Sequence, residues 1–244
     1  MFDIKHFSKV TSTNDIAKEL AQKGNDEWTV IIADTQECGR GRMGRSFFSP
    51  SGTGLYMSIL LRPTFKAEKS QLLTTAAAVA VSEAIEKHTG DEVQIKWVND
   101  VCKGGKKVCG ILTEGSILQN GFFEYAILGI GVNLTLPNDG FGALESIAGA
   151  VFDSDAFDRD GFIEDILVNF EKYYRNLEAK PHFDGYVNRE MLTGKEVDVI
   201  RAGEVLYSAK VIGVDKDFAL LVERGTVTEA ISSGEVSVKP TAKN

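Results

Sequence analysis

Cysteine and histidine are scarce in this chain of 244 residues, with three of each. The cysteines, Cys38, Cys102 and Cys109, are odd in number, and none belongs to a Cys-x-x-Cys pair. A disulfide framework needs paired cysteines and a structural zinc site needs closely spaced ones, so we expect neither. We instead expect three free thiols, the usual state of cysteine in a reducing cytosol.

Long apolar runs are also missing. No stretch reaches about 18 consecutive apolar residues, the length that a membrane span requires. The first ten residues, Met1–Val10, contain no apolar run of signal-peptide length. We therefore expect a cytoplasmic protein that does not interact with membranes.

The chain also lacks an excess of positive charge. Lysine and arginine total 27 against 35 aspartate and glutamate, which gives a formal net charge of -8. Proteins that coat nucleic acids or membrane surfaces usually carry broad basic faces, so the balance disfavours both classes. Hydrophobic residues make up 43% of the chain, enough for a substantial core, and the length fits one large domain or one domain plus a small appendage.

The hydrophobic pattern predicts a mixed α and β order. Apolar runs and alternation predict strands, and helical spacing with capping signals predicts helices. The expected strands are 4–10, 28–34, 54–63, 93–98, 106–118 and 122–134, and the expected helices are 11–23, 69–90 and 159–179. This is not the strict alternation of a doubly wound parallel sheet, so we predict an α+β fold with a mixed or antiparallel sheet backed by helices.

Two of the predicted helices have apolar stripes that should face the core. The stripe of the first comprises Leu72, Leu73, Ala76, Ala77, Ala80 and Ala84, and that of the second comprises Phe162, Ile166, Phe170, Tyr173, Tyr174 and Leu177. After Gly194 only short alternating strands and tight turns remain, about fifty residues that are typical of a small β-barrel. We therefore divide the chain into domains at 1–190 and 191–244.

The segment Gly39–Arg45, "GRGRMGR", concentrates three arginines and three glycines in an otherwise acidic protein. Glycine allows the backbone to turn sharply and approach a ligand, and arginine presents a planar fork of donors that matches carboxylate and phosphate oxygens. The spacing fits neither a P-loop nor a dinucleotide-binding fingerprint. The segment predicts an anion-binding loop, and the alternative is a solvated turn.

Three further segments share this chemistry. "KWVND", Lys96–Asp100, ends a predicted strand with a lysine, an amide and a carboxylate, and "KKVCGILTE" places Lys107 at the start of the next strand. "GIGVNL", Gly129–Leu134, combines two glycines with Asn133. Taken singly, the lysines could only cover a sheet edge and the glycines could only mark a bulge. Their joint presence and order favour one ligand site.

In this order the segments resemble those of biotin–protein ligases, also called biotin–[acetyl-CoA-carboxylase] ligases. The matching residues are "STN" at Ser12–Asn14, "GRGRMGR", "KWVND", "KVCGILTE" and "GIGVN", and the closing "SSGEVSVK" is similar to the C-terminal domain of that family. Val98 departs from the pattern, because the family usually has proline there. The first strand begins near Ile4, so the resemblance is to the short form without an N-terminal DNA-binding domain.

The resemblance implies a class II synthetase-like catalytic domain with a small C-terminal SH3-like β-barrel. It also implies a two-step reaction: biotin and ATP form biotinyl-5′-AMP and pyrophosphate, and a lysine of a biotin carboxyl carrier domain then takes the biotin. Biotin and ATP are the implied substrates, with Mg²⁺ as the accompanying ion, although no metal ligands are identified. The acceptor protein and the choice between monomer and homodimer stay open.

Carried over residue by residue, the resemblance assigns three sets. The implied biotin-binding residues are Ser12, Thr13, Asn14, Gln36, Arg40, Gly41, Arg42, Lys107, Gly110, Gly129 and Gly131. The implied ATP-binding residues are Arg40, Arg42, Arg45, Phe47, Lys96, Asn99, Lys107 and Asn133. The implied catalytic residues are Lys107, Arg42 and Asp100, while His6, His88 and His182 lie outside every motif and are expected to be structural.

Two other functions are compatible with parts of the pattern. A lipoate–protein ligase would use the same adenylation chemistry, but its apolar substrate has no ureido ring and needs no set of donors and acceptors such as "STN" with Gln36. An RNA-binding module would use the arginine–glycine loop and the C-terminal barrel. The acidic total and the lack of aromatic residues interleaved with the basic ones disfavour it.

Overall fold

Seven strands form one mixed sheet in the computed structural model, which describes residues 1–232 and 236–241. The strand order is β1-β2-β3-β7-β6-β5-β4; β1 runs parallel to β2, and every other neighbouring pair is antiparallel. The strands are β1 (Asp3–Phe7), β2 (Thr29–Ala33), β3 (Gly54–Leu61), β4 (Gln94–Lys96), β5 (Asp100–Lys103), β6 (Lys106–Ile117) and β7 (Phe123–Asn133). The predicted mixed sheet is confirmed.

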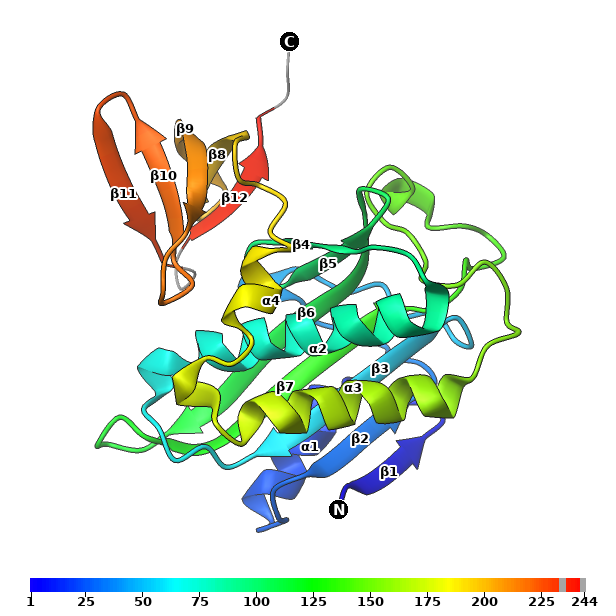
Figure 1. Cartoon of the computed structure of the whole chain (residues 1–244). Coiled ribbons are helices and arrows are strands. Elements are labelled where there is room, and N and C mark those ends of the chain that lie inside the picture. The colour runs from blue at the N-terminus through cyan, green and yellow to red at the C-terminus, as the bar shows by residue number, and fades with distance from the viewer. Residues whose placement is uncertain (233–235, 242–244) are drawn as a thin grey trace.

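Helices cover the two faces of this sheet unequally (Figure 1). Helices α2 (Gln71–Thr89) and α3 (Arg159–Tyr174) lie side by side on one face, with the short α4 (Phe183–Val187) beyond them. Among the described residues, α1 (Thr13–Gln22) is the one helix that packs on the other face, where Ala17 and Ala21 meet Ile31, Leu60 and Ile127 of the sheet. Much of that second face is therefore left without a helix.

Helix α2 is buried more completely than its apolar stripe predicted. Every residue from Leu72 to Ser82 is buried, including the polar Thr75 and Ser82. The stripe alone was too narrow a prediction because α2 has the sheet on one side and α3 and α4 on others. Thr75 and Ser82 are accommodated because their hydroxyls donate to backbone carbonyls one turn earlier, such as Ser82 to Ala78 at 2.7 Å.

Helix α3 follows its predicted pattern with one exception. Phe162, Ile166, Phe170 and Tyr173 are buried, and Leu177 is buried just beyond the helix end. Tyr174 is only half-buried, and its hydroxyl donates to Glu27 at 2.5 Å. A phenol with an accessible acceptor can remain at the surface, so tyrosine marks the core less reliably than phenylalanine.

The segment after Lys96 differs from the predicted single strand end. Strand β4 ends at Lys96, Trp97–Asn99 form a turn, and Asp100 begins the separate strand β5. Strands of three and four residues are too short for a recognisable alternation, which is why the sequence did not reveal the hairpin. The turn nevertheless places Asn99 and Asp100 beside Gly110 and Ile111 of β6.

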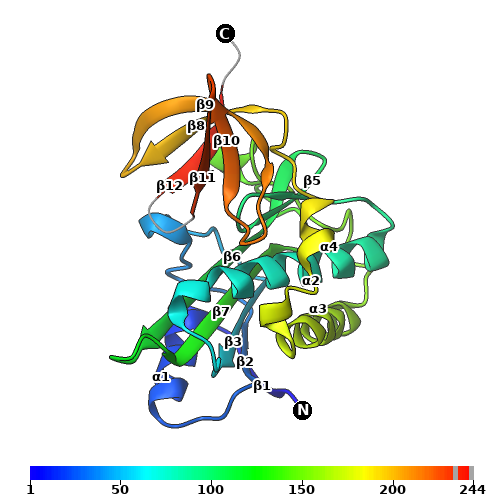
Figure 2. The same ribbon diagram turned by 60° about the vertical axis from the view of Figure 1, so that its left-hand side comes forward.

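The C-terminal residues form a separate antiparallel sheet that stands at one end of the molecule, above α4 and β4 (Figures 1 and 2). Its order is β11-β10-β9-β8-β12, and its strands are β8 (Glu196–Arg201), β9 (Glu204–Val214), β10 (Leu220–Arg224), β11 (Val227–Ile231) and β12 (Val236–Pro240). The predicted C-terminal β unit is confirmed. Residues 233–235 of the closing motif lie outside the described residues.

Among the described residues, no helix combines the length and the apolarity that crossing a membrane would take.

Candidate active site

A cavity of about 750 Å³ lies on the face of the large sheet that carries only α1. Its walls come from the start of α1, the arginine–glycine loop, the turn before β5 and the end of β12. Strands β3, β6 and β7 form the floor, where Tyr56, Gly131 and Gly110 lie opposite one another in neighbouring strands. Directly paired residues point to the same face, so the cavity is built on one surface of the sheet.

The floor is deep because three predicted positions carry no side chain. A Cβ atom on Gly129 would lie 2.4 Å from Asn14 Oδ1, and one on Gly131 would lie 2.7 Å from the Phe47 ring. A Cβ on Gly110 would lie 3.0 Å from the Lys107 side chain. Glycine is therefore required at Gly129 and Gly131 because polar and aromatic groups from above rest directly on the backbone of the sheet.

One end of the cavity is a partly buried hydrogen-bond network. Gln36 Oε1 accepts from the Thr13 amide at 2.9 Å and from the Thr13 hydroxyl at 3.1 Å. Ser58 Oγ lies 2.8 Å from Thr13 Oγ1 and 2.6 Å from Asn14 Oδ1. Asn14 Nδ2 donates to Glu114 at 2.6 Å. Donors and acceptors fixed in this way suit a compact polar ligand that has both.

Two members of this network, Ser58 and Glu114, were missed from the sequence. Ser58 is fully buried in the middle of the otherwise apolar β3, and a polar residue in such a strand was the signal that could have found it. Glu114 is the last residue of "KVCGILTE", on the same face as Gly110 and two residues beyond Leu112. The C-terminal unit also reaches the cavity, through Val238, Lys239 and Pro240 of β12.

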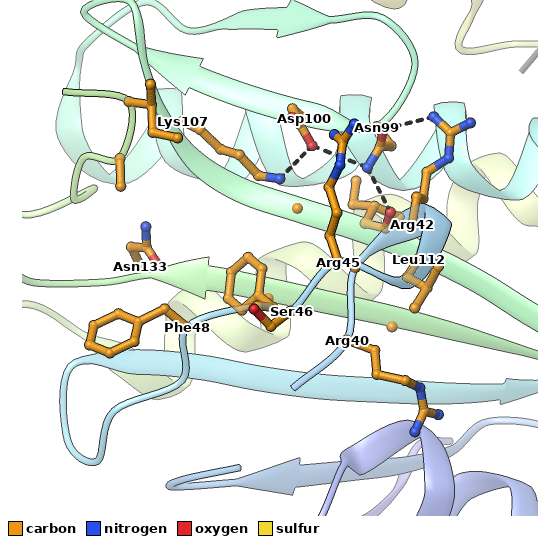
Figure 3. A pocket seen from close by; sticks show the side chains of 18 of the residues that line it. Arg40, Arg42, Arg45, Ser46, Phe48, Asn99, Asp100, Lys107, Leu112 and Asn133 are labelled. Carbon is orange, nitrogen blue, oxygen red and sulfur yellow. Dashed lines mark hydrogen bonds and ion pairs between the residues drawn. The ribbon is translucent and has the colours of Figure 1, made fainter. Parts of the chain in front are cut away.

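The other end is a chain of charged and amide groups (Figure 3). Arg42 Nη1 donates to Asn99 Oδ1 at 3.1 Å, Asn99 Nδ2 donates to Asp100 Oδ1 at 3.1 Å, and Lys107 Nζ lies 2.7 Å from the same Asp100 oxygen. Burial lowers the pKa of the Arg42 guanidinium, and the Asp100 charge opposes that shift. All three predicted catalytic residues therefore meet at one place, with Asn99 between them.

Arg40 lies apart from this cluster. Its guanidinium pairs with Asp15 of α1 at 2.8 Å and with Glu114 at 3.1 Å, and in Figure 3 it points toward α1. Burial lowers its pKa, but the hydrogen bonds to Asp15 and Glu114 dominate together and raise it. Arg40 of the loop therefore binds at the end of the cavity that holds the hydrogen-bond network, and Arg42 binds at the end that holds Asn99, Asp100 and Lys107.

The remaining predicted residues line the cavity at several points. Phe47 lies over the glycine floor, with Lys107 Nζ 5.9 Å from its ring centre. Asn133 Nδ2 donates to the Gly149 carbonyl at 3.0 Å. Ser12, Gly41, Arg45 and Lys96 also line the cavity. The structure therefore gathers every predicted site residue around one cavity, although Phe47 shares the glycine floor rather than forming a separate subsite.

One of the three cysteines, Cys102, lines the cavity. All three are free, with Cys38 exposed and Cys102 and Cys109 buried. Burial raises the pKa of Cys102 to about 11 and also raises that of Cys109, so both stay protonated near neutral pH. In the part of the chain that the structure describes, no three carboxylate, thiol or imidazole groups gather as a metal site.

Two family models match this chain. The model of the biotin/lipoate A/B protein ligase family matches residues 7–133, more than half of the chain and most of the cavity. The chain belongs to this family. A model of the biotin protein ligase C-terminal domain matches residues 192–239, which include all five C-terminal strands except for the last residue of β12.

Individual members of the family cover nearly the whole chain. The bifunctional ligase/repressor BirA of Bacillus subtilis (strain 168) is 35% identical over 94% of this chain and 72% of its own length. The biotin–[acetyl-CoA-carboxylase] ligase of Paracoccus denitrificans is 30% identical over 94% of this chain and 98% of its own length. The solved biotin protein ligase from Aquifex aeolicus in complex with biotin and ATP superposes with a TM-score of 0.77 at 27% identity, covering 99% of this chain and 100% of that one.

Proposed function

We propose that this ligase joins biotin to ATP, giving biotinyl-5′-AMP and pyrophosphate, and then transfers biotin to a lysine of a biotin carboxyl carrier domain, forming an amide and releasing AMP. One observation carries the proposal. A single cavity has a fixed donor–acceptor network at one end, a glycine floor in the middle and a cluster of cations at the other end. These three zones match a ureido ring, an acyl chain and a carboxylate beside a phosphate, in that order.

Biotin recognition falls to the network around Thr13, Gln36 and Asn14. The ureido group of biotin has one carbonyl acceptor and two N–H donors, so it needs both kinds of partner at fixed positions. Ser58 and Glu114 hold Asn14 by hydrogen bonds from two sides, which fixes the orientation of its amide. A lipoyl group offers no such polar head and would leave these buried groups without new partners.

The first step brings together two anions, the biotin carboxylate and the α-phosphate. A carboxylate is already ionised near pH 7, so no base is needed, and the obstacle is charge repulsion. At about 4 Å and an effective dielectric constant near 20, that repulsion is roughly 4 kcal/mol per pair of unit charges. Lys107 is the cation placed to bridge the two groups, with Arg42 beside it. Lysine has three donors, so it can keep Asp100 while contacting both substrates.

The second step consumes an acceptor lysine whose unperturbed pKa is about 10.4, so nearly all of it is protonated near pH 7. Asp100 is the carboxylate that pairs with Lys107 at the cationic end of the cavity, and it is our candidate to receive that proton. Its ion pair with Lys107 supports this role, because Lys107 would bind the reacting carboxylate of biotin. Asp100 would therefore hold Lys107 in the first step and accept the proton of the acceptor amine in the second.

The arginine–glycine loop, Gly39–Arg45, acts as a lid in this proposal. A mixed anhydride hydrolyses readily, so water must be excluded until the acceptor arrives. Arg42 closes one side of the cavity by its bond to Asn99. Glycine gives the loop the freedom to open and close, and arginine makes closure depend on the bound anion.

Mg²⁺ would enter with the triphosphate. This fits the donor set at the cationic end of the cavity, where Asp100 stands among cations and amides, because Mg²⁺ commonly keeps most of its waters and binds through substrate phosphates. When bound, the ion would neutralise phosphate charge, and Asn99 and Asn133 are the amides that would lie near it.

The two parts of the chain, each built on its own sheet, would have different roles. We assign the chemistry to residues 1–190 and a supporting role to residues 191–244. The family-model boundaries at 133 and 192 are compatible with this division. We also expect the protein to work in the cytoplasm, where its free thiols stay reduced.

The test is ATP–pyrophosphate exchange with biotin or lipoate as the second substrate. We expect exchange with biotin and at least a hundredfold slower exchange with lipoate, since a site built around hydrogen bonds rejects a ligand that lacks them by such factors or more. Exchange that prefers lipoate would overturn the biotin assignment. Absence of exchange with either acid, together with steeply salt-dependent RNA binding, would favour the RNA-binding alternative instead.

A further inference from the structure

A phenylalanine of the C-terminal unit inserts into the catalytic unit behind the active site. Phe218 lies in the turn between β9 and β10 and is fully buried. Its ring stacks on His182 with centres 4.8 Å apart and planes at 4°, and it packs edge-on against Tyr186 at 5.3 Å and obliquely against Phe183 at 5.4 Å. These three rings, which come from α4 and the residue before it, form what we call the Phe218 cage.

The backbone of Phe218 is tied to the catalytic unit as well. Its carbonyl oxygen accepts from Trp97 Nε1 at 2.8 Å and from Gln71 Nε2 at 2.6 Å. Trp97 belongs to the turn between β4 and β5, and Gln71 is the first residue of α2. One residue of the C-terminal unit thus receives hydrogen bonds from the active-site turn and from the central helix.

Hydrogen bonds within the turn that presents Phe218 hold its shape. Asp215 Oδ1 accepts from the amides of Asp217 at 2.8 Å and Ala219 at 2.9 Å. The backbone of Phe218 has φ 60°, a left-handed conformation that is uncommon for a bulky residue. Such a conformation persists only where its surroundings over-determine it, and here the capped turn and the aromatic cage do so.

The cage also contacts the turn that precedes the residues binding the catalytic cations. Tyr186, which packs on Phe218, donates its hydroxyl to the Val98 carbonyl at 3.2 Å. Asn99 and Asp100 follow directly, and they bind Arg42 and Lys107. Trp97 and Val98 are therefore held from behind by the Phe218 cage, while the next two residues form the cationic end of the cavity.

We propose that Phe218 is a positioning residue for the adenylation step: its insertion sets the Trp97–Asp100 turn so that Asn99 and Asp100 hold Arg42 and Lys107 in place. This rests on the proposed function. It gives the C-terminal unit a specific part in the first step, through a contact behind the cavity rather than through β12 at its rim. Phe218 itself touches none of the reacting groups.

The test disrupts the contacts between Phe218 and the catalytic unit. Trp97→Phe keeps an aromatic ring but loses the N–H that donates to Phe218, and Phe218→Ala removes the inserted ring. Lys180→Met is the matched control, because Lys180 binds Asp217 and the Lys216 carbonyl at the same interface without contacting the turn at Trp97–Asp100. For each protein we would measure the kcat of biotin-dependent ATP–pyrophosphate exchange, the biotin Kd by calorimetry, and Tm.

We expect kcat to fall about tenfold in Trp97→Phe and up to about a hundredfold in Phe218→Ala, since displacing a catalytic group by about 1 Å can cost such factors. The biotin Kd should change less than about twofold, because the Thr13–Gln36–Asn14 network shares no contact with the cage. Phe218→Leu should recover part of the rate that Phe218→Ala loses. Lys180→Met should keep the wild-type kcat even if its Tm falls.

Three results would overturn the inference. One is a wild-type kcat in Trp97→Phe and Phe218→Ala. The second is an equal loss of kcat in Lys180→Met, which would make the effect one of general stability. The third is a parallel loss of biotin binding and kcat, which would point to partial unfolding. Failure of the proposed function is distinct, because the wild-type protein would then show no biotin-dependent exchange.

Discussion

At the scale of single residues, the site depends on the pair formed by Lys107 and Asp100. The two groups meet at 2.7 Å at the end of the cavity where Arg42 also lies. One carboxylate beside two cations leaves this end positively charged, which suits two anionic substrates. Their roles in the two reaction steps can be separated by substitution.

Lys107→Ala should lower the rate of adenylate formation far more than it weakens the binding of a stable adenylate analogue. Loss of one preorganised contact to developing charge costs roughly 3 kcal/mol, or about a hundredfold in rate. Pre-steady-state adenylation and calorimetric titration of the analogue provide the comparison. Lys106→Ala is the control, because Lys106 is an exposed neighbour outside the cavity. Equal losses of rate and affinity would mean that Lys107 only binds substrate.

Asp100→Asn should separate the two steps. The amide oxygen can still accept from Lys107 and Asn99, so exchange should stay within about threefold of wild type, by the small difference expected when a hydrogen bond is kept. Transfer should slow markedly and recover in part as pH rises toward 9.5, because more of the acceptor lysine is then neutral. Single-turnover transfer from the preloaded adenylate complex measures this. Loss of exchange with normal transfer would assign Asp100 to nucleotide binding instead.

At the scale of elements, the lid loop and the helices make different demands on the sequence. The loop lines the cavity and contributes little burial: Met43 is exposed, and Arg42 reaches Asn99 from a short 3-10 turn at Arg42–Gly44. The helices contribute burial and few cavity-lining residues. Substitutions in the loop should therefore change retention of the intermediate, and substitutions in the helices should change stability.

Arg42→Gly should still allow biotin and ATP to react but should release the adenylate faster. The substitution removes the bond to Asn99 and the charge that the bound phosphate would attract. Met43→Gly is the matched control, because it adds a glycine to the same loop at a residue with φ 56°, which glycine adopts readily. Adenylate release rates and labelling of bystander lysines are the measurements. Equal retention in Arg42→Gly and wild type would exclude the lid role.

Phe170→Ala in α3 should lower the free energy of unfolding by about 3–5 kcal/mol, the usual cost of emptying a buried aromatic site. Phe170 is fully buried and packs on Trp28 and Tyr174. Val168→Ala on the same helix should cost less than about 0.5 kcal/mol, because Val168 is 48% exposed. Urea unfolding of both variants tests the orientation of α3. Similar losses in the two variants would contradict it.

At the scale of the whole molecule, the contact between the two sheets should make stability depend on pH. His182 is 1% exposed and lies against Phe218, and its Nδ1 lacks a hydrogen-bond partner. Burial lowers the pKa of His182 from 6.5 to about 4, and the nearby Lys180 charge adds to this. As the pH falls, His182 of the unfolded chain therefore becomes protonated near pH 6.5, whereas His182 of the folded protein becomes protonated only near pH 4.

Stability from this group is fully present above pH 6.5 and is lost as pH falls from 6.5 toward 4. The loss should reach roughly 3 kcal/mol, since one pKa unit corresponds to about 1.4 kcal/mol. His182→Gln, which does not titrate, should show a shallower decline over the same range. Urea unfolding at several pH values from 7.5 to 4 gives the comparison. Parallel declines in the two proteins would show that other groups govern the acid limb.

Much of the active site was determined by the sequence alone. The motifs predicted the cavity residues through their joint presence and order, and through the family resemblance that they carry together, because each motif taken singly allowed another interpretation. The buried strands at β2, β3 and β7 were equally clear, since a continuous apolar run has no stable place outside a core. Local patterns of this kind report what a segment requires from its surroundings.

What required the tertiary structure was the identity of those surroundings. Ser58 and Glu114 became site residues only when the pairing of β3, β6 and β7 set them on the same face as Gly129. The complete burial of α2 depended on α3 and α4, and the importance of Phe218 depended on a cage formed by residues about 35 positions earlier in the chain. Each of these is a contact between segments that are distant in the sequence. A contact of this kind is not encoded by the local periodicity of either segment, so only the tertiary structure reveals it.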